Sequence, residues 1–216
     1  IRLLLIPETI GAIYFIKNKF NHIKKNLIFG LNLTCVGING PYTCISTISE
    51  NTYADKIVER IGSKYKNFKK ISFNYRGSNE RQFGCQNLKL PFVTLCRKKF
   101  GEYKQYHTSA DNLSILKPKV IIETCEFVKK IVDEINANNI YKKKDYCEPF
   151  LANKNLIENI GTLKNMKKSN RKNISDFLAH VGINHDLKSL KSELKINNIE
   201  KLATTLEKKK LIKKYF

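Results

Sequence analysis

Two kinds of segment take turns along this chain. One kind is a short run that is apolar throughout or in which apolar and polar residues alternate, and in the other kind apolar residues recur every three or four positions. Runs of this kind are typical of sheet strands, and the helical spacing is typical of helices that cover a sheet. The predicted strands are 2–6, 27–36, 70–75 and 90–96, and the predicted helices are 10–25, 53–65 and 120–135. The alternation predicts an α/β fold with a parallel sheet.

The composition changes after this α/β part. A polar, lysine-rich stretch at 136–145 follows the last long helix, and a Lys/Asn run at 163–173 is typical of a linker or a solvated loop. Three short helical patterns and a strand-like tail end the chain, in the outline of a winged helix. They are 174–181, 186–194, 199–209 and 211–216. We therefore predict an α/β domain at 1–145, a connecting segment at 146–172 and a winged-helix domain at 173–216.

The net charge is +21, from 40 Lys and Arg against 19 Asp and Glu. Such a charge suits a nucleic acid or another polyanion. The excess is almost all lysine and asparagine is abundant, which is the usual imprint of an A/T-rich genome, so we do not favour nucleic acid as the partner.

No apolar run reaches the roughly 18 residues that span a bilayer, so we expect no membrane partner. The six cysteines form no Cys-x-x-Cys pair, which argues against a structural zinc cluster. Because we find no export signal, we expect reduced thiols and a cytoplasmic protein. The oligomeric state is not predicted.

Acidic residues stand at two positions where chemistry is often found. Glu8 directly follows the first predicted strand, and ligands of open α/β sheets lie at the carboxyl ends of strands. Its carboxylate can act as a general base or can cap the next helix. Glu80 lies in a loop-like motif, where it can bind a metal or pair with Arg76 or Arg81.

His107 lies in a loop-like segment rich in tyrosine and close to Asp111. A neutral imidazole binds zinc well, and a nearby carboxylate can fix its tautomer. The alternative is a solvated loop histidine with no ligand.

Three motifs in this order resemble those of bacterial zinc aminopeptidase-like proteins, which are often labelled polysaccharide-biosynthesis proteins. The motifs are Ile6–Gly11, Arg76–Gln82 and Gly101–Asp111. The resemblance extends through Cys147–Phe150 into the C-terminal winged helix. It implies part of a three-layer zinc-exopeptidase-like sheet with flanking helices, and a hydrolase that cleaves an amide or peptide bond in a peptide-like or amide-bearing small substrate.

The resemblance also implies residue roles. Glu8 is the general base that activates a zinc-bound water, and His107 is a zinc ligand. Glu80 is a ligand or an acid beside the ligands. The side chains expected to shape the pocket or bind a substrate carboxylate are Arg76, Arg81, Tyr106 and Asp111.

The sequence departs from the family pattern in three places. The family's upstream segment, with a His-Pro element and a bridging Asp, is missing. Asn79 stands where relatives usually have Asp, and Thr34 and Cys35 stand where the wider class has a metal-binding Asp. We therefore expect an N-terminally truncated chain in which zinc binding is weak or absent and which is inactive alone. The alternatives are a binding or regulatory module that docks DNA or protein through the winged helix, and a degenerate pseudoenzyme.

Overall fold

The sheet of the first part of the chain has four strands, in the computed structural model that describes residues 1–154, 156 and 168–215. They are β1 (Gly30–Leu33), β2 (Thr43–Ile45), β3 (Lys69–Ile71) and β4 (Phe92–Cys96), in the order β1-β4-β2-β3. The chain forms two compact units, Ile1–Ile135 and Asn136–Phe216, and each is described by itself.

The prediction of a parallel sheet is wrong, because β2 runs antiparallel to β4. The pairs β1–β4 and β2–β3 are parallel, so the sheet is mixed. Only nine residues, 34–42, connect β1 to β2. A crossover that returns the chain to the same direction needs about a dozen residues or more, so this short connection reverses the chain instead.

The predicted strand at 2–6 is also wrong, since none of these residues joins the sheet. The segment packs along the first helix, where Ile6 contributes to the apolar cluster and a Cβ on Gly11 would lie 2.7 Å from the Ile6 Cβ. Leu3 and Leu5 face outward and are 80% and 89% exposed. The apolar run therefore packs one face on a helix and exposes the other. A continuous apolar run looks the same in sequence whether it forms such a segment or a strand buried on both faces.

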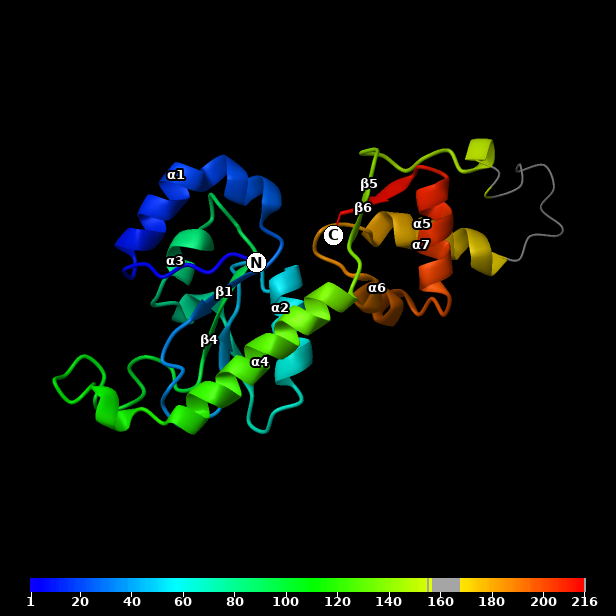
Figure 1. Cartoon of the computed structure of the whole chain (residues 1–216). Coiled ribbons are helices and arrows are strands. Elements are labelled where there is room, and N and C mark those ends of the chain that lie inside the picture. Colours follow the sequence, from blue (N-terminus) through cyan, green and yellow to red (C-terminus); the bar gives the residue numbers. More distant parts are fainter. Residues whose placement is uncertain (155, 157–167, 216) are drawn as a thin grey trace. The chain divides into compact units, whose positions relative to one another are not determined.

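The helices cover both faces of the sheet (Figure 1). On one face lie α1 (Ile10–Asn26) and α3 (Glu80–Phe83), where the Phe83 ring stacks on Phe92 with centroids 4.1 Å apart. Strand residues alternate between faces, so Val93 and Leu95 are directed to the opposite face, which carries α2 (Tyr53–Gly62) and α4 (Pro118–Ala137). The ion pair between Arg60 and Glu134, 2.8 Å long, joins α2 to α4.

Asp55 fixes the start of α2. Thr52 is the N-cap, and its hydroxyl and the Asp55 carboxylate form a reciprocal capping box. The same carboxylate accepts hydrogen bonds from the Thr47 amide at 2.9 Å and the Thr47 hydroxyl at 2.5 Å. Asp55 is 1% exposed, so one buried anion ties the helix to the loop that follows β2.

The described residues of the second unit form three α-helices and a two-stranded antiparallel sheet. The elements are β5 (Tyr141–Lys143), α5 (Lys168–His180), α6 (Leu187–Leu194), α7 (Ile199–Lys208) and β6 (Ile212–Lys214). Of the predicted 163–173 linker, residues 163–167 lie outside the described residues and 168–173 belong to α5. Strand β5 was missed because it lies in the lysine-rich stretch and its partner strand is far away in sequence.

Three short 3-10 helices complete the described structure: η1 (Phe73–Tyr75), η2 (Leu113–Ile115) and η3 (Ala152–Lys154). The predicted strand at 70–75 therefore ends at Ile71 and continues as η1. Among the described residues, no helix has both the length and the apolar character needed to cross a bilayer.

Replacing Asp55 with Asn is expected to lower the free energy of unfolding by about 2 kcal/mol, because the new amide group faces hydroxyl and N–H donors in a buried site. Urea denaturation followed by circular dichroism measures the change. Asp133→Asn is the control, since Asp133 forms an exposed ion pair with Lys129 and its loss should leave stability nearly unchanged. Equal stabilities for the two variants would contradict this role of Asp55.

Candidate functional site

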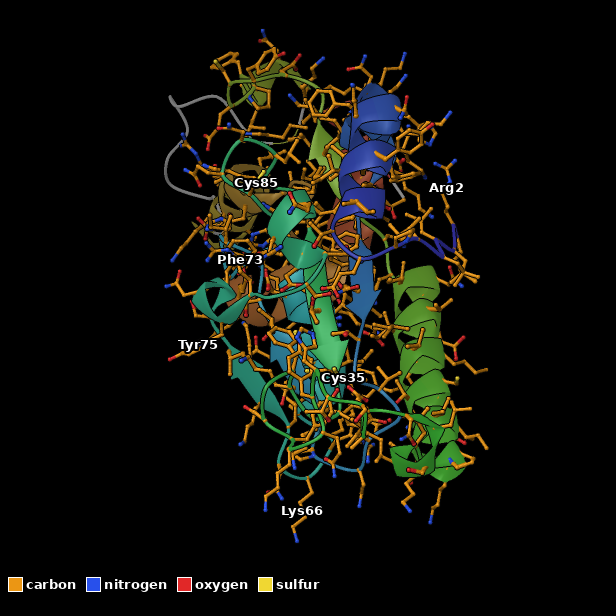
Figure 2. All side chains as sticks on the ribbon, turned by 90° about the vertical axis from the view of Figure 1, so that its left-hand side faces the viewer. Arg2, Cys35, Lys66, Phe73, Tyr75 and Cys85 are labelled. Carbon is orange, nitrogen blue, oxygen red and sulfur yellow. The ribbon has the colours of Figure 1, made fainter. Side chains whose placement is uncertain are left out.

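Parallel strands β1 and β4 end side by side, and the segments that follow them meet there. The Cys35 thiol, just past β1, lies 3.7 Å from the Tyr103 hydroxyl in the loop after β4. The Tyr103 hydroxyl donates to Asp111 Oδ2 at 3.1 Å. Figure 2 shows Cys35 at the end of the sheet toward which the β1 and β4 arrows point. Ligands of open α/β sheets bind at such carboxyl ends.

Two half-buried tyrosines and an exposed histidine form the rim of this region. The rings of Tyr106 and His107 stack with centroids 4.0 Å apart, and Tyr103 meets Tyr106 edge-on at 5.5 Å. His107 is exposed and has a φ of 58°, in the left-handed region. The structure thus holds His107 on the loop by ring stacking and leaves its imidazole open to solvent.

Glu8 lies in the electrostatic neighbourhood of this rim. Burial raises the pKa of Tyr106, and the negative potentials of Cys35, Glu8 and Asp111 raise it further. Burial and hydrogen bonds to Cys35 and Asp111 raise the pKa of Tyr103 in the same way. Both phenols therefore stay protonated at neutral pH and act as hydrogen-bond donors.

The Glu8 loop is held in a strained conformation. Thr9 has a φ of 63° and a ψ of −66°, which costs on the order of 1–3 kcal/mol for a residue with a Cβ. Its amide donates to Asn79 Oδ1 at 2.8 Å, and its hydroxyl accepts from Arg81 Nη2 at 3.3 Å. Thr9 is the N-cap of α1 and no side chain caps that helix, so the exposed Glu8 carboxylate is not a helix cap.

Glu80 has a different environment from the one expected, because its side chain is fully buried. One carboxylate oxygen accepts from the amides of Gly77 at 2.7 Å and Ser78 at 2.9 Å. The other accepts from the Thr94 hydroxyl at 2.6 Å and the Asn32 amide group at 3.3 Å. Each oxygen is therefore saturated by neutral donors, and neither is directed to solvent or to an added ligand.

Neither arginine of the motif pairs with Glu80. Arg76 lies over the Phe73 ring, 5.0 Å from its centroid, and donates to the Phe73 carbonyl at 3.5 Å. Arg81 donates to the Thr9 hydroxyl. The suggested ion pair between Glu80 and one of these arginines is thus not formed. Arg76 bonds to a backbone carbonyl and Arg81 to a hydroxyl instead. Both guanidinium groups belong to exposed residues.

These contacts form one connected path from the sheet centre to the Glu8 loop. Thr94 on β4 and Asn32 on β1 hold Glu80, and Glu80 holds the amides of residues 77 and 78. The next residue, Asn79, then accepts from the Thr9 amide. Glu80 thereby acts as a positioning residue for the loop that carries Glu8.

The described residues do not fit the zinc that the family resemblance implies. They contain no group of three or more His, Cys, Asp or Glu side chains that could hold a metal ion. Glu80 has no free oxygen, and catalytic zinc takes three protein ligands. No step of a reaction is therefore assigned here to a metal.

Sequence reasoning missed the roles of Cys35 and Tyr103 in the site and of Asn32, Ser78 and Thr94 in the buried network. One signal for the network was available, because Asn32 and Thr94 are polar residues inside otherwise apolar strand runs. Such residues need buried partners, and Glu80 is the partner that they share.

Replacing Asn79 with Ala should free the Thr9 amide and speed its hydrogen exchange by about fivefold, because roughly 1 kcal/mol of hydrogen bonding is lost. Asn79→Asp is the matched variant, since a carboxylate oxygen can accept the same bond. The exchange rate of the Thr9 amide, measured by NMR, should be nearly the same in Asn79→Asp as in the parent. Unchanged exchange in Asn79→Ala would show that Asn79 does not hold the loop.

Three comparisons place the chain among known proteins. Residues 1–138 match a family described as a domain of unknown function, DUF4910. A protein of Clostridium acetobutylicum named "Putative polysaccharide biosynthesis protein with aminopeptidase-like domain" is 33% identical over 165 residues, which cover 74% of this chain and 37% of that protein. The crystal structure of a "putative peptidase" from the same organism matches with a TM-score of 0.61 and 25% identity, over 96% of this chain and 46% of that chain.

The chain spans less than half of the length of both relatives. Its mixed sheet with flanking helices resembles the fold of the solved peptidase. The chain is therefore a member of the DUF4910 family, and it is related to a polysaccharide biosynthesis protein with an aminopeptidase-like domain.

Proposed function

We propose that this chain forms part of the active site of an aminopeptidase-like hydrolase that cleaves an amide bond in a peptide-like substrate. The observation that carries the proposal is the convergence of three motifs at the carboxyl ends of β1 and β4. Asn79 holds the loop of Glu8, and the potential of Glu8 acts on Tyr106 in the third motif. Family membership supports the peptidase-like chemistry.

Each side chain of the site has its own proposed role. Glu8 is exposed on a strained, anchored loop, so its carboxylate can accept a proton from an attacking water. The protonated hydroxyl of Tyr106 can donate to the substrate carbonyl as negative charge develops on its oxygen, while the Tyr103 hydroxyl holds Asp111 in place. Asp111 suits a substrate amine, and the free donors of Arg81 suit a substrate carboxylate.

A chimera tests this proposal, in which the part of the Clostridium relative that this chain does not match is joined to the chain. We expect release of p-nitroaniline from aminoacyl p-nitroanilides, and a fall in kcat of about 10²–10⁴-fold in Glu8→Gln, as for loss of a general base. Glu50→Gln is the control, since Glu50 is an exposed carboxylate outside the three motifs. The chain alone is expected to show no turnover.

Two results would contradict the proposal. Turnover that is equal in Glu8→Gln and in the parent chimera removes the role of Glu8. A folded chimera that turns over none of the substrates favours the degenerate pseudoenzyme.

A second candidate function is the docking of nucleic acid on a winged helix formed by the second unit. In the β5–β6 sheet Lys142 lies directly opposite Lys213, and like charges in this position destabilise a strand pair. The Lys142 ammonium lies 4.5 Å from the Tyr215 ring centroid, which adds an aromatic surface. A phosphate backbone would relieve this repulsion.

Helix α7 is less suited to read bases than the sheet is to bind phosphates. The hydroxyls of Thr204 and Thr205 donate to carbonyls of their own helix, at 2.9 and 2.8 Å. Lys201 and Lys208 remain exposed on the same helix. Binding by this unit should therefore depend on charge and not on base sequence.

Fluorescence anisotropy with duplex DNA, titrated with salt, measures this second function on the full chain. Reversing both charges in Lys142→Glu/Lys213→Glu should weaken binding by at least about tenfold at low salt. Lys66→Glu/Lys64→Glu is a charge-matched control on exposed residues of the first unit. Equal weakening by the two pairs would indicate unspecific attraction to a basic protein.

A further inference from the structure

Strand β1 is an open edge of the sheet. It stands at the end of the strand order and pairs only with β4 among the described residues. The amides of Gly30 and Thr34 donate to carbonyls on the β4 side. Backbone groups alternate in direction along a strand, so the amides of Leu31 and Leu33 are directed away from β4. An exposed edge of this kind is a template for pairing with another chain.

Helix α4 carries an apolar stripe beside the stripe that it buries. Val120, Thr124, Phe127 and Ile131 are its buried residues. One position further along, a second stripe is half-buried or exposed, and it consists of Ile121, Cys125, Val128, Val132 and Ile135. The two stripes together make one wide apolar face, and the first unit covers its second half only in part. The second stripe indicates that α4 has a further surface to cover.

The open edge and the uncovered stripe belong to one surface. The Thr124 hydroxyl bonds to the carbonyl of Val36 just past β1, and a Cβ on Gly37 would lie 3.4 Å from the Ile121 side chain. Leu33 is 45% exposed and Ile121 38%. In Figure 2, α4 and the first residues of the chain, with Arg2 labelled, lie on the same side of β1. We call β1 with the second stripe of α4 the seam.

We propose that the seam binds the portion of the aminopeptidase-like fold that the longer relatives carry and this sequence does not, and that this portion adds a β-strand beside β1. In the solved relative, the match covers 96% of this chain but only 46% of the relative's own length. More than half of the relative's chain therefore lies outside the matched fold. Added strands obtain affinity from backbone hydrogen bonds and specificity from side-chain contacts, and the seam offers both. The inference stands on this surface and not on the proposed reaction.

Coexpression tests the seam. The tagged full chain is produced together with the part of the Clostridium relative that it does not match. The complex is captured through the tag, and its molar mass is measured by light scattering. We expect a 1:1 complex, and at least about tenfold less recovered partner with Leu33→Lys/Ile121→Lys. Leu113→Lys is the control, because Leu113 is 83% exposed in η2, outside the seam. Equal recovery with all variants would overturn the proposal.

Amide exchange and dye binding test the seam on the chain alone if no complex is recovered. The amides of Leu31 and Leu33 should exchange rapidly, as unpaired edge groups do. Binding of the dye ANS should fall in Leu33→Lys/Ile121→Lys and not in Leu113→Lys. Slow exchange at both amides in the isolated chain would overturn the proposal, and so would a homodimer that is lost in Leu33→Lys/Ile121→Lys, because the seam would then bind a second copy.

Discussion

The first unit depends on a buried carboxylate that is neutralised by dipoles and not by a cation. Glu80 accepts two backbone amides, a hydroxyl and a side-chain amide, and it is completely excluded from solvent. Burying a charge is costly unless hydrogen bonds satisfy it. These donors come from β1, β4 and the loop before α3, so they hold the carboxylate only when the sheet and the loop are assembled together.

The same interaction explains how a strained loop can persist at the edge of the site. Thr9 occupies a backbone conformation that an isolated chain would avoid, and Asn79 holds it there. Asn79 in turn follows the two residues whose amides Glu80 fixes. The rigidity of the sheet is thereby transmitted to the loop of Glu8, which gives an exposed carboxylate a defined position without burying it.

The seam borders the candidate site, because both include the segment that follows β1. An α/β sheet binds its ligands where strands end side by side, and among the described residues β1 has a neighbouring strand on one side only. The site is thus open along the same line as the apolar surface.

The three long helices of the first unit could be predicted closely from sequence, because 3.6-residue periodicity is a local property. The predictions at 10–25, 53–65 and 120–135 fall on α1, α2 and α4. Strand direction, the outward face of residues 2–6 and strand β5 could not be predicted, because each depends on what packs against the segment. Strand β5, for example, is defined by β6 near the other end of the chain.

The sequence by itself determined the chemistry that is available in the three motifs and their family resemblance, since these reside in residue identity and order. Only the tertiary structure decided what each residue does. It buried Glu80 among neutral donors, left Glu8 exposed on an anchored loop, and stacked His107 on Tyr106 at the rim. The physical reason is that solvation and hydrogen-bond partners decide the role of a carboxylate or an imidazole, and both are properties of the assembled fold.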